Sequence, residues 1–101
     1  LSVEKMIEVV GAGAGSSWQM VNVGPKISKD DMKPGFMIDL ILKDLDIVMS
    51  AAVGQGLSLH GTAAAQAYFR AAAKKGHGRD GTQAMCKALD ARDVCCRLSD
   101  F

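Results

Sequence analysis

The segment of residues 37–53 constrains the fold of this chain more than any other, because it carries the longest helical pattern. Drawn as a helix, it is apolar over more than half of its circumference, which is wider than a surface helix requires. Its polar residues fall in one narrow stripe, formed by Asp39, Lys43, Asp46 and Ser50. We therefore expect a core helix that other helices enclose.

One acidic residue, Asp44, falls on the apolar side of this helix, between Met37 and Leu40. An unpaired carboxylate is costly to bury, so Asp44 is expected to meet a helix N-terminus, backbone donors or a cation. Its neighbour Lys43 points in a different direction on a helix. Two interpretations stay open: Lys43 is a surface lysine beside an internal acid that caps another helix, or it is placed at a ligand by an acid that fixes its surroundings.

The N-terminal third predicts two short helices separated by a glycine-rich turn. Ser2 can cap the first helix, and the three glycines of residues 11–15 cost too much backbone entropy for that helix to continue. Ser16 or Ser17 then caps a second helix. Residues 26–33 are expected to form a polar connection.

The C-terminal half predicts two further helices. Thr62 is expected to cap an alanine-rich helix over residues 63–75, where alanine allows close helix approach. Asp80 or Thr82 is expected to cap a final helix that extends as far as Leu98. No segment alternates apolar and polar residues as a strand does, so the predicted class is all-α, a bundle of about five helices.

Length, charge and cysteine usage exclude several classes of protein. The chain has 101 residues, which is room for a single domain over residues 1–101. Its formal net charge of +1 provides no general attraction for nucleic acid, and no apolar run is long enough to span a membrane. Three cysteines without metal-type spacing favour a reducing compartment, the cytoplasm or the mitochondrial matrix.

Three motifs that could carry chemistry have simpler explanations. The glycines of residues 11–15 follow a predicted helix rather than a strand and lack the spacing of a dinucleotide-binding loop, so they are expected to form a turn between helices. His60 and His77 have no acidic residue or cysteine at ligand spacing, and no metal site is expected. The basic residues within 74–79 lack interleaved aromatic side chains, which favours a solvated loop over phosphate or RNA contact.

Three stretches together resemble the C-terminal helical domain of the β-hydroxyacid dehydrogenases. They are Pro34-Gly35-Phe36 followed by Lys43-Asp44-Leu45, then Gly15-Ser16-Ser17-Trp18, and finally Gly76-x-Gly78-x-Asp80. This family includes 3-hydroxyisobutyrate dehydrogenase, tartronate semialdehyde reductase and glyoxylate reductases, and is related to 6-phosphogluconate dehydrogenase. The likeness spans roughly residues 1–89.

The resemblance implies a function and a set of partners. In this family an N-terminal Rossmann domain binds NAD or NADP, and the helical domain closes over the cofactor and a small hydroxyacid substrate. The resemblance implies that Lys43 reaches the cofactor near its nicotinamide end, that Asp44 supports Lys43 and that Phe36 lines the cleft. In the family a long helix that joins the two domains covers part of the helical domain. Without that helix the chain is expected to leave apolar surface uncovered and to form a symmetric homodimer.

The catalytic lysine of the family, in a Lys-x-x-x-Asn pattern, is absent here, as is the Rossmann fingerprint. We therefore expect a C-terminal piece of a larger NAD(P)-dependent oxidoreductase, catalytically incomplete alone and with no catalytic residue of its own. The alternative is a non-catalytic association module, for which the alanine-rich residues 63–73 would form the partner surface. Only a domain that closes a cleft has a use for Lys43 and Asp44 on this helix.

Overall fold

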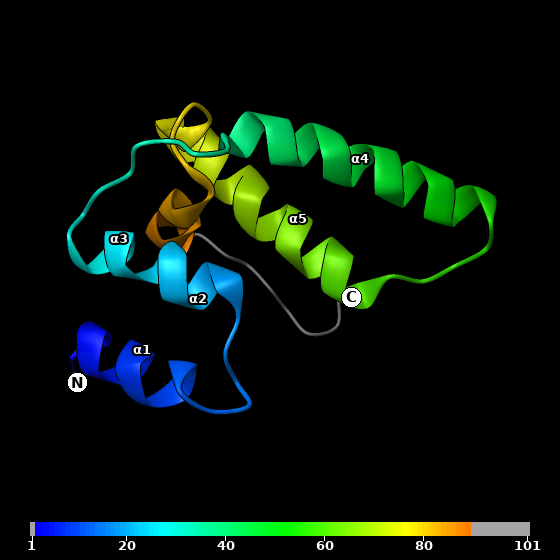
Figure 1. Cartoon of the computed structure of the whole chain (residues 1–101). Coiled ribbons are helices and arrows are strands. Elements are labelled where there is room, and N and C mark those ends of the chain that lie inside the picture. Colours follow the sequence, from blue (N-terminus) through cyan, green and yellow to red (C-terminus); the bar gives the residue numbers. More distant parts are fainter. Residues whose placement is uncertain (1, 90–101) are drawn as a thin grey trace. The chain divides into compact units, whose positions relative to one another are not determined.

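The computed structural model describes residues 2–89 of the chain (Figure 1). These residues form five α-helices, one π-helical turn and one 3-10 helix, and they contain no β-strand. The predicted all-α class is thereby confirmed. The chain divides into two compact units, one ending at Lys33 and the other beginning at Pro34. None of the helices within residues 2–89 is both long and apolar enough to cross a membrane.

The first helix of the N-terminal unit, α1, spans Val3–Gly11 and begins as predicted. The Ser2 hydroxyl accepts a hydrogen bond from the backbone N–H of Lys5 at 3.2 Å, which satisfies one of the free donors at the helix start. The helix ends at Gly11, within the glycine run that was expected to break it.

The second helix, α2 (Trp18–Asn22), is capped by Ser17, whose hydroxyl accepts from the N–H of Met20 at 3.0 Å. A third helix, α3 (Gly24–Ser28), then forms. The expected polar connection over residues 26–33 is therefore wrong for residues 26–28 and confirmed for residues 29–33, which form a turn and an irregular segment. Pro25 fits the first turn of this helix, because the N–H groups of a first turn have no partner within the helix and the N–H that proline lacks is not missed there.

The C-terminal unit is built on α4 (Ile38–Gly54) and α5 (His60–Ala72), which lie side by side in Figure 1. Gly56 closes the connection between them with φ +68°, a left-handed conformation that glycine adopts without strain. Thr62 is not the cap of α5. The N–H of Ala63 bonds instead to the carbonyl of Leu59, so that the helix begins earlier in the chain.

Two short elements follow α5, the π-helical turn η1 (Ala73–His77) and the 3-10 helix η2 (Thr82–Ala88). The residue that caps η2 is Gly81, and neither of the predicted caps serves. Both have other partners: the Asp80 carboxylate lies 2.8 Å from His77 Nδ1, and the Thr82 N–H donates to the carbonyl of Phe36 at 3.0 Å. Leu98, the predicted limit of the last helix, lies outside the described residues.

The core of the C-terminal unit is made of small side chains. Helices α4 and η2 both pack against α5, and Ile38 is the only large side chain that is fully buried among the described residues. The other apolar side chains buried there are all alanines: Ala52, Ala72, Ala84 and Ala88. Alanine lets the helix backbones approach one another, as the sequence predicted for α5.

Asp44 is exposed, and the prediction that it is buried is wrong. The reason is that α5 and the two short elements cover only one side of α4. Apolar side chains elsewhere on α4 remain in contact with solvent, among them Ile47 at 62% and Val53 at 76% exposure. The described residues of the C-terminal unit therefore do not enclose α4, although its pattern predicts a helix that others enclose.

Candidate functional site

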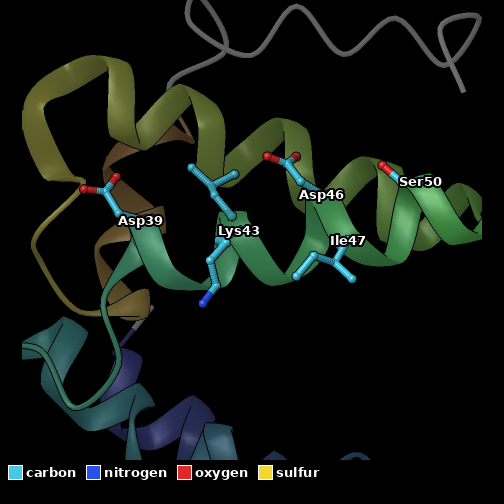
Figure 2. Close-up of a pocket in the computed structure, with 6 residues that line it drawn as sticks. Asp39, Lys43, Asp46, Ile47 and Ser50 are labelled. Carbon is cyan, nitrogen blue, oxygen red and sulfur yellow. The ribbon is translucent and has the colours of Figure 1, made fainter.

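The polar stripe of α4 lines an open depression of about 540 Å³ (Figure 2). All of its lining residues come from α4, and they are Asp39, Leu42, Lys43, Asp46, Ile47 and Ser50. Four of them are the stripe residues recognised in the sequence, because helical spacing alone places them on one face. The depression combines two acids, one lysine and apolar side chains.

Asp46 is tied to the neighbouring helix. Its Oδ1 accepts a hydrogen bond from Arg70 Nη2 at 3.1 Å and another from Gln66 Nε2, both on α5. The two charged side chains are about half exposed, so water weakens the attraction between them. The bonds nevertheless fix which way the Asp46 carboxylate points.

Among the residues that the structure describes, Lys43 is the only cation that lines the depression, and it is exposed. Within residues 2–89 its ammonium has no ion pair, and Figure 2 shows it directed away from the Asp46 carboxylate. A lysine without a partner keeps its charge available to an anionic or polar ligand.

The structure places the other two predicted site residues outside the lining of this depression. Asp44 follows Lys43 on α4 and projects from a different side of the helix, so it does not line the depression. Phe36 precedes α4, has 42% of its surface exposed, and is held through its carbonyl by Thr82. The structure thus brings together Lys43, Asp39 and Asp46.

The start of α4 is held by the segment of residues 76–82. The N–H groups of Ile38 and Asp39 donate to the carbonyls of Asp80 and Gly78 at 3.0 and 2.8 Å. Met37 and Gly81 also form an isolated antiparallel bridge. The first N–H groups of α4 are therefore already bonded, and they are not free to bind an anion.

A glycine lies where this segment meets Asp39. A Cβ atom on Gly78 would overlap the Asp39 carboxylate in its present position, so a side chain at position 78 would require this exposed carboxylate to move. The basic residues within 74–79 predicted a solvated loop, and that pattern gave no indication of this contact. The only sequence signal for it was the Gly76-x-Gly78 spacing, which entered the analysis through the family resemblance.

Comparison with known proteins shows the family. The family model described as "NAD-binding of NADP-dependent 3-hydroxyisobutyrate dehydrogenase" matches residues 1–89. The chain belongs to this family. The resemblance to the β-hydroxyacid dehydrogenases is thereby confirmed, over the same part of the chain that carried it.

Curated relatives agree with this assignment. A probable 3-hydroxyisobutyrate dehydrogenase-like protein of Arabidopsis thaliana, described as mitochondrial, is 37% identical over 89% of this chain and 27% of its own length. An L-threonate dehydrogenase of Cupriavidus necator is 33% identical over 83% of this chain and 28% of its own length.

A solved structure supports the fold. The crystal structure of 3-hydroxyisobutyrate dehydrogenase from Salmonella typhimurium matches with a TM-score of 0.81 and 28% identity, over 84% of this chain and 30% of that one. The chain thus spans less than a third of the length of these relatives.

Proposed function

We propose that this chain is the helical domain that closes over a nicotinamide cofactor and a small β-hydroxyacid in an NAD(P)-dependent oxidoreductase of the 3-hydroxyisobutyrate dehydrogenase type. In this proposal residues 1–101 act as one domain. The observation that supports it most directly is Lys43, an unpaired cation in a depression of a chain that belongs to this family.

The residues present fit contact with one end of such a cofactor, but not the binding of a whole dinucleotide. Lys43 offers a charge to a phosphate or carboxamide oxygen, and Ile47 offers apolar surface beside it. No glycine-rich loop follows a strand within residues 2–89, so we assign the rest of the cofactor to an N-terminal Rossmann domain.

Each residue then has a definite task. The cofactor supplies the hydride chemistry when bound. Lys43 orients the cofactor, and Phe36 lines the cleft between the domains. The resemblance also assigns a supporting role to Asp44, which would act from another side of α4, because it forms no ion pair with Lys43. The chain contributes no proton-transfer lysine of the Lys-x-x-x-Asn type, so it is inactive alone.

We extend the proposal to assembly and location. Exposed apolar residues on α4, such as Val48 and Val53, favour a homodimer. A reducing compartment, the cytoplasm or the mitochondrial matrix, suits the free thiol of Cys86.

Replacement of Lys43 tests the function. In the full-length protein that carries this domain, Lys43→Met should raise the dissociation constant of reduced nicotinamide cofactor, measured by its fluorescence, while the circular dichroism spectrum stays unchanged. The matched control is Lys74→Met, which removes an exposed lysine on η1 that lies outside the depression. Equal affinities in the two variants would refute a role for Lys43.

The alternative is a non-catalytic association module whose partner surface was expected to be the alanine-rich residues 63–73. The alanine-rich helix α5 packs against α4, η1 and η2 inside its own unit, so it is not a free partner face. The exposed apolar residues of α4 would have to take its place. Such a module predicts that Val53→Ser changes the oligomeric state and that Lys43→Met changes nothing.

A further inference from the structure

Lys43 and Asp46 have the spacing at which a helix pairs opposite charges. Side chains three residues apart lie on the same face of a helix and can meet. The chain contains an example in α1, where Lys5 Nζ lies 3.1 Å from Glu8 Oε2 at the same spacing and in the same order. A lysine followed by an acid three residues later is therefore in position to form an ion pair.

In α4 the acid is held by the neighbouring helix instead. Asp46 Oδ1 accepts from Arg70 Nη2 and from Gln66 Nε2, both of which reach it from α5. Figure 2 shows the Asp46 carboxylate and the Lys43 ammonium pointing in different directions. No ion pair joins Lys43 to Asp46.

The other acids near Lys43 do not neutralise it either. Asp39 lies four residues before Lys43, but its carboxylate rests against Gly78 and forms no ion pair with the lysine. Asp44 is the next residue along the helix and projects from another side of it. Asp46 is thus the acid whose partner decides the state of Lys43.

We propose that Arg70 and Gln66 are positioning residues that hold Asp46 toward α5 and thereby keep the Lys43 ammonium free for a ligand. The arrangement concerns the two helices alone. Only the identity of the ligand, the nicotinamide cofactor, rests on the function proposed above.

Zero-length cross-linking of the 101-residue chain tests the arrangement directly. A carbodiimide joins a lysine amine and a carboxylate that touch, forming an amide with loss of water, and peptide mass spectrometry locates the link. In the wild-type chain we expect a link between Lys5 and Glu8 and only background linking between Lys43 and Asp46. A wild-type Lys43–Asp46 link as abundant as the Lys5–Glu8 link would overturn the proposal.

Variants of α5 supply the second half of this test. Gln66→Leu combined with Arg70→Met releases Asp46, and the Lys43–Asp46 link should rise several-fold toward the level of the Lys5–Glu8 link. Arg70→Lys keeps a cation beside Asp46 and should keep the link near background. The Lys5–Glu8 yield and the helical circular dichroism check folding, and Arg70→Met alone serves if the double variant does not fold. No rise in any folded variant that lacks Arg70 would refute the proposal.

Cofactor affinity then separates this inference from the proposed function. In the full-length protein, Arg70→Met should raise the dissociation constant of reduced nicotinamide cofactor about twofold, the size of a helical ion pair at this spacing, with kcat unchanged. Adding Asp46→Asn should restore the affinity. If Lys43→Met leaves affinity unchanged, the proposed function fails; if only Arg70→Met has no effect, the positioning role fails.

Discussion

His77 Nδ1 lies 2.8 Å from Asp80 Oδ2, and this contact closes the turn whose carbonyls bond the first N–H groups of α4. The His77 side chain is 27% exposed and that of Asp80 41% exposed, so the pair is only partly shielded from water. It connects η1 to the start of the helix that carries Lys43.

Loss of this contact should weaken the C-terminal unit modestly. We expect His77→Ala to lower the free energy of unfolding by about 1 kcal/mol, because one partly exposed hydrogen bond is lost. Thermal melting followed by circular dichroism measures the change. His60→Ala is the matched control, because His60 is exposed and its side chain forms no hydrogen bond or ion pair within residues 2–89. Equal losses in the two variants would contradict a role for the His77–Asp80 contact.

Gly78→Ala should destabilise the same region by about 0.5–1.5 kcal/mol, because the added methyl group forces the exposed Asp39 carboxylate out of its present rotamer. Urea unfolding measures the effect. Gly35→Ala should be nearly neutral, since a Cβ there meets nothing within 4 Å. Asp39→Ala in the Gly78→Ala background should recover most of the loss; if it recovers none, the clash lies elsewhere.

Asp44→Ala should change the free energy of unfolding by less than about 0.5 kcal/mol, because Asp44 is exposed. Ile38→Ala, at a fully buried position of the same helix, should cost about 2–5 kcal/mol. Thermal melting of both variants gives the comparison. A large loss for Asp44→Ala would mean that this carboxylate has a partner after all.

Glu4 provides a prediction about pH. Hydrogen bonds from its own backbone N–H and from the hydroxyls of Ser28 and Ser2, together with nearby Lys29, hold the pKa of Glu4 below its ordinary value of 4.5. The stabilisation is present above the unfolded-state pKa and is lost as the pH falls through the lower folded-state pKa. Helical circular dichroism below pH 4.5 should therefore fall more in the wild type than in Glu4→Gln.

Ser28→Ala is the control for this titration, because it removes one of the donors to Glu4. Its acid profile should lie between those of the wild type and Glu4→Gln. Superimposable wild-type and Glu4→Gln profiles would show that Glu4 contributes nothing to acid unfolding.

The exposed apolar side of α4 should make the isolated chain self-associate. Light scattering across a concentration series should show a mass above that of the monomer, and Val53→Ser should lower it. Val9→Ser removes a similarly exposed valine, at 66%, from α1 and is the control. A monomer mass at every concentration would rule out this surface as a site of association.

The features predicted best from the sequence are those that depend only on residues a few positions apart, such as helix caps and the polar stripe of α4. Ser2 and Ser17 cap helices because a serine hydroxyl reaches the free N–H groups three residues later, whatever the rest of the chain does. The polar stripe of α4 was correct for the same reason. Asp80 and Thr82 failed as caps because η2 begins at Thr82, which leaves Gly81 at the cap position. The bond from the Thr82 N–H to the Phe36 carbonyl joins distant parts of the chain and has no local signature.

Contacts between residues far apart in the chain could not be predicted from the sequence. The pattern of α4 shows that most of the helix surface is apolar, but it does not show which parts of the chain cover that surface. For this reason Asp44 was predicted to be buried, although it is exposed. The candidate site was found only in part: Lys43 was identified, whereas the bond from Arg70 to Asp46 joins residues on two helices and has no local signature.

The bonds from residues 78 and 80 to the first turn of α4 also set an order of events during synthesis. Helix α4 is translated before these residues, so the N–H groups of Ile38 and Asp39 lack these carbonyl partners until residues 78 and 80 have been added to the chain. The segment made late therefore completes a helix made early. A nascent chain that stops before Gly78 carries α4 with an open first turn, and this end of the helix becomes fixed only after η1 has emerged.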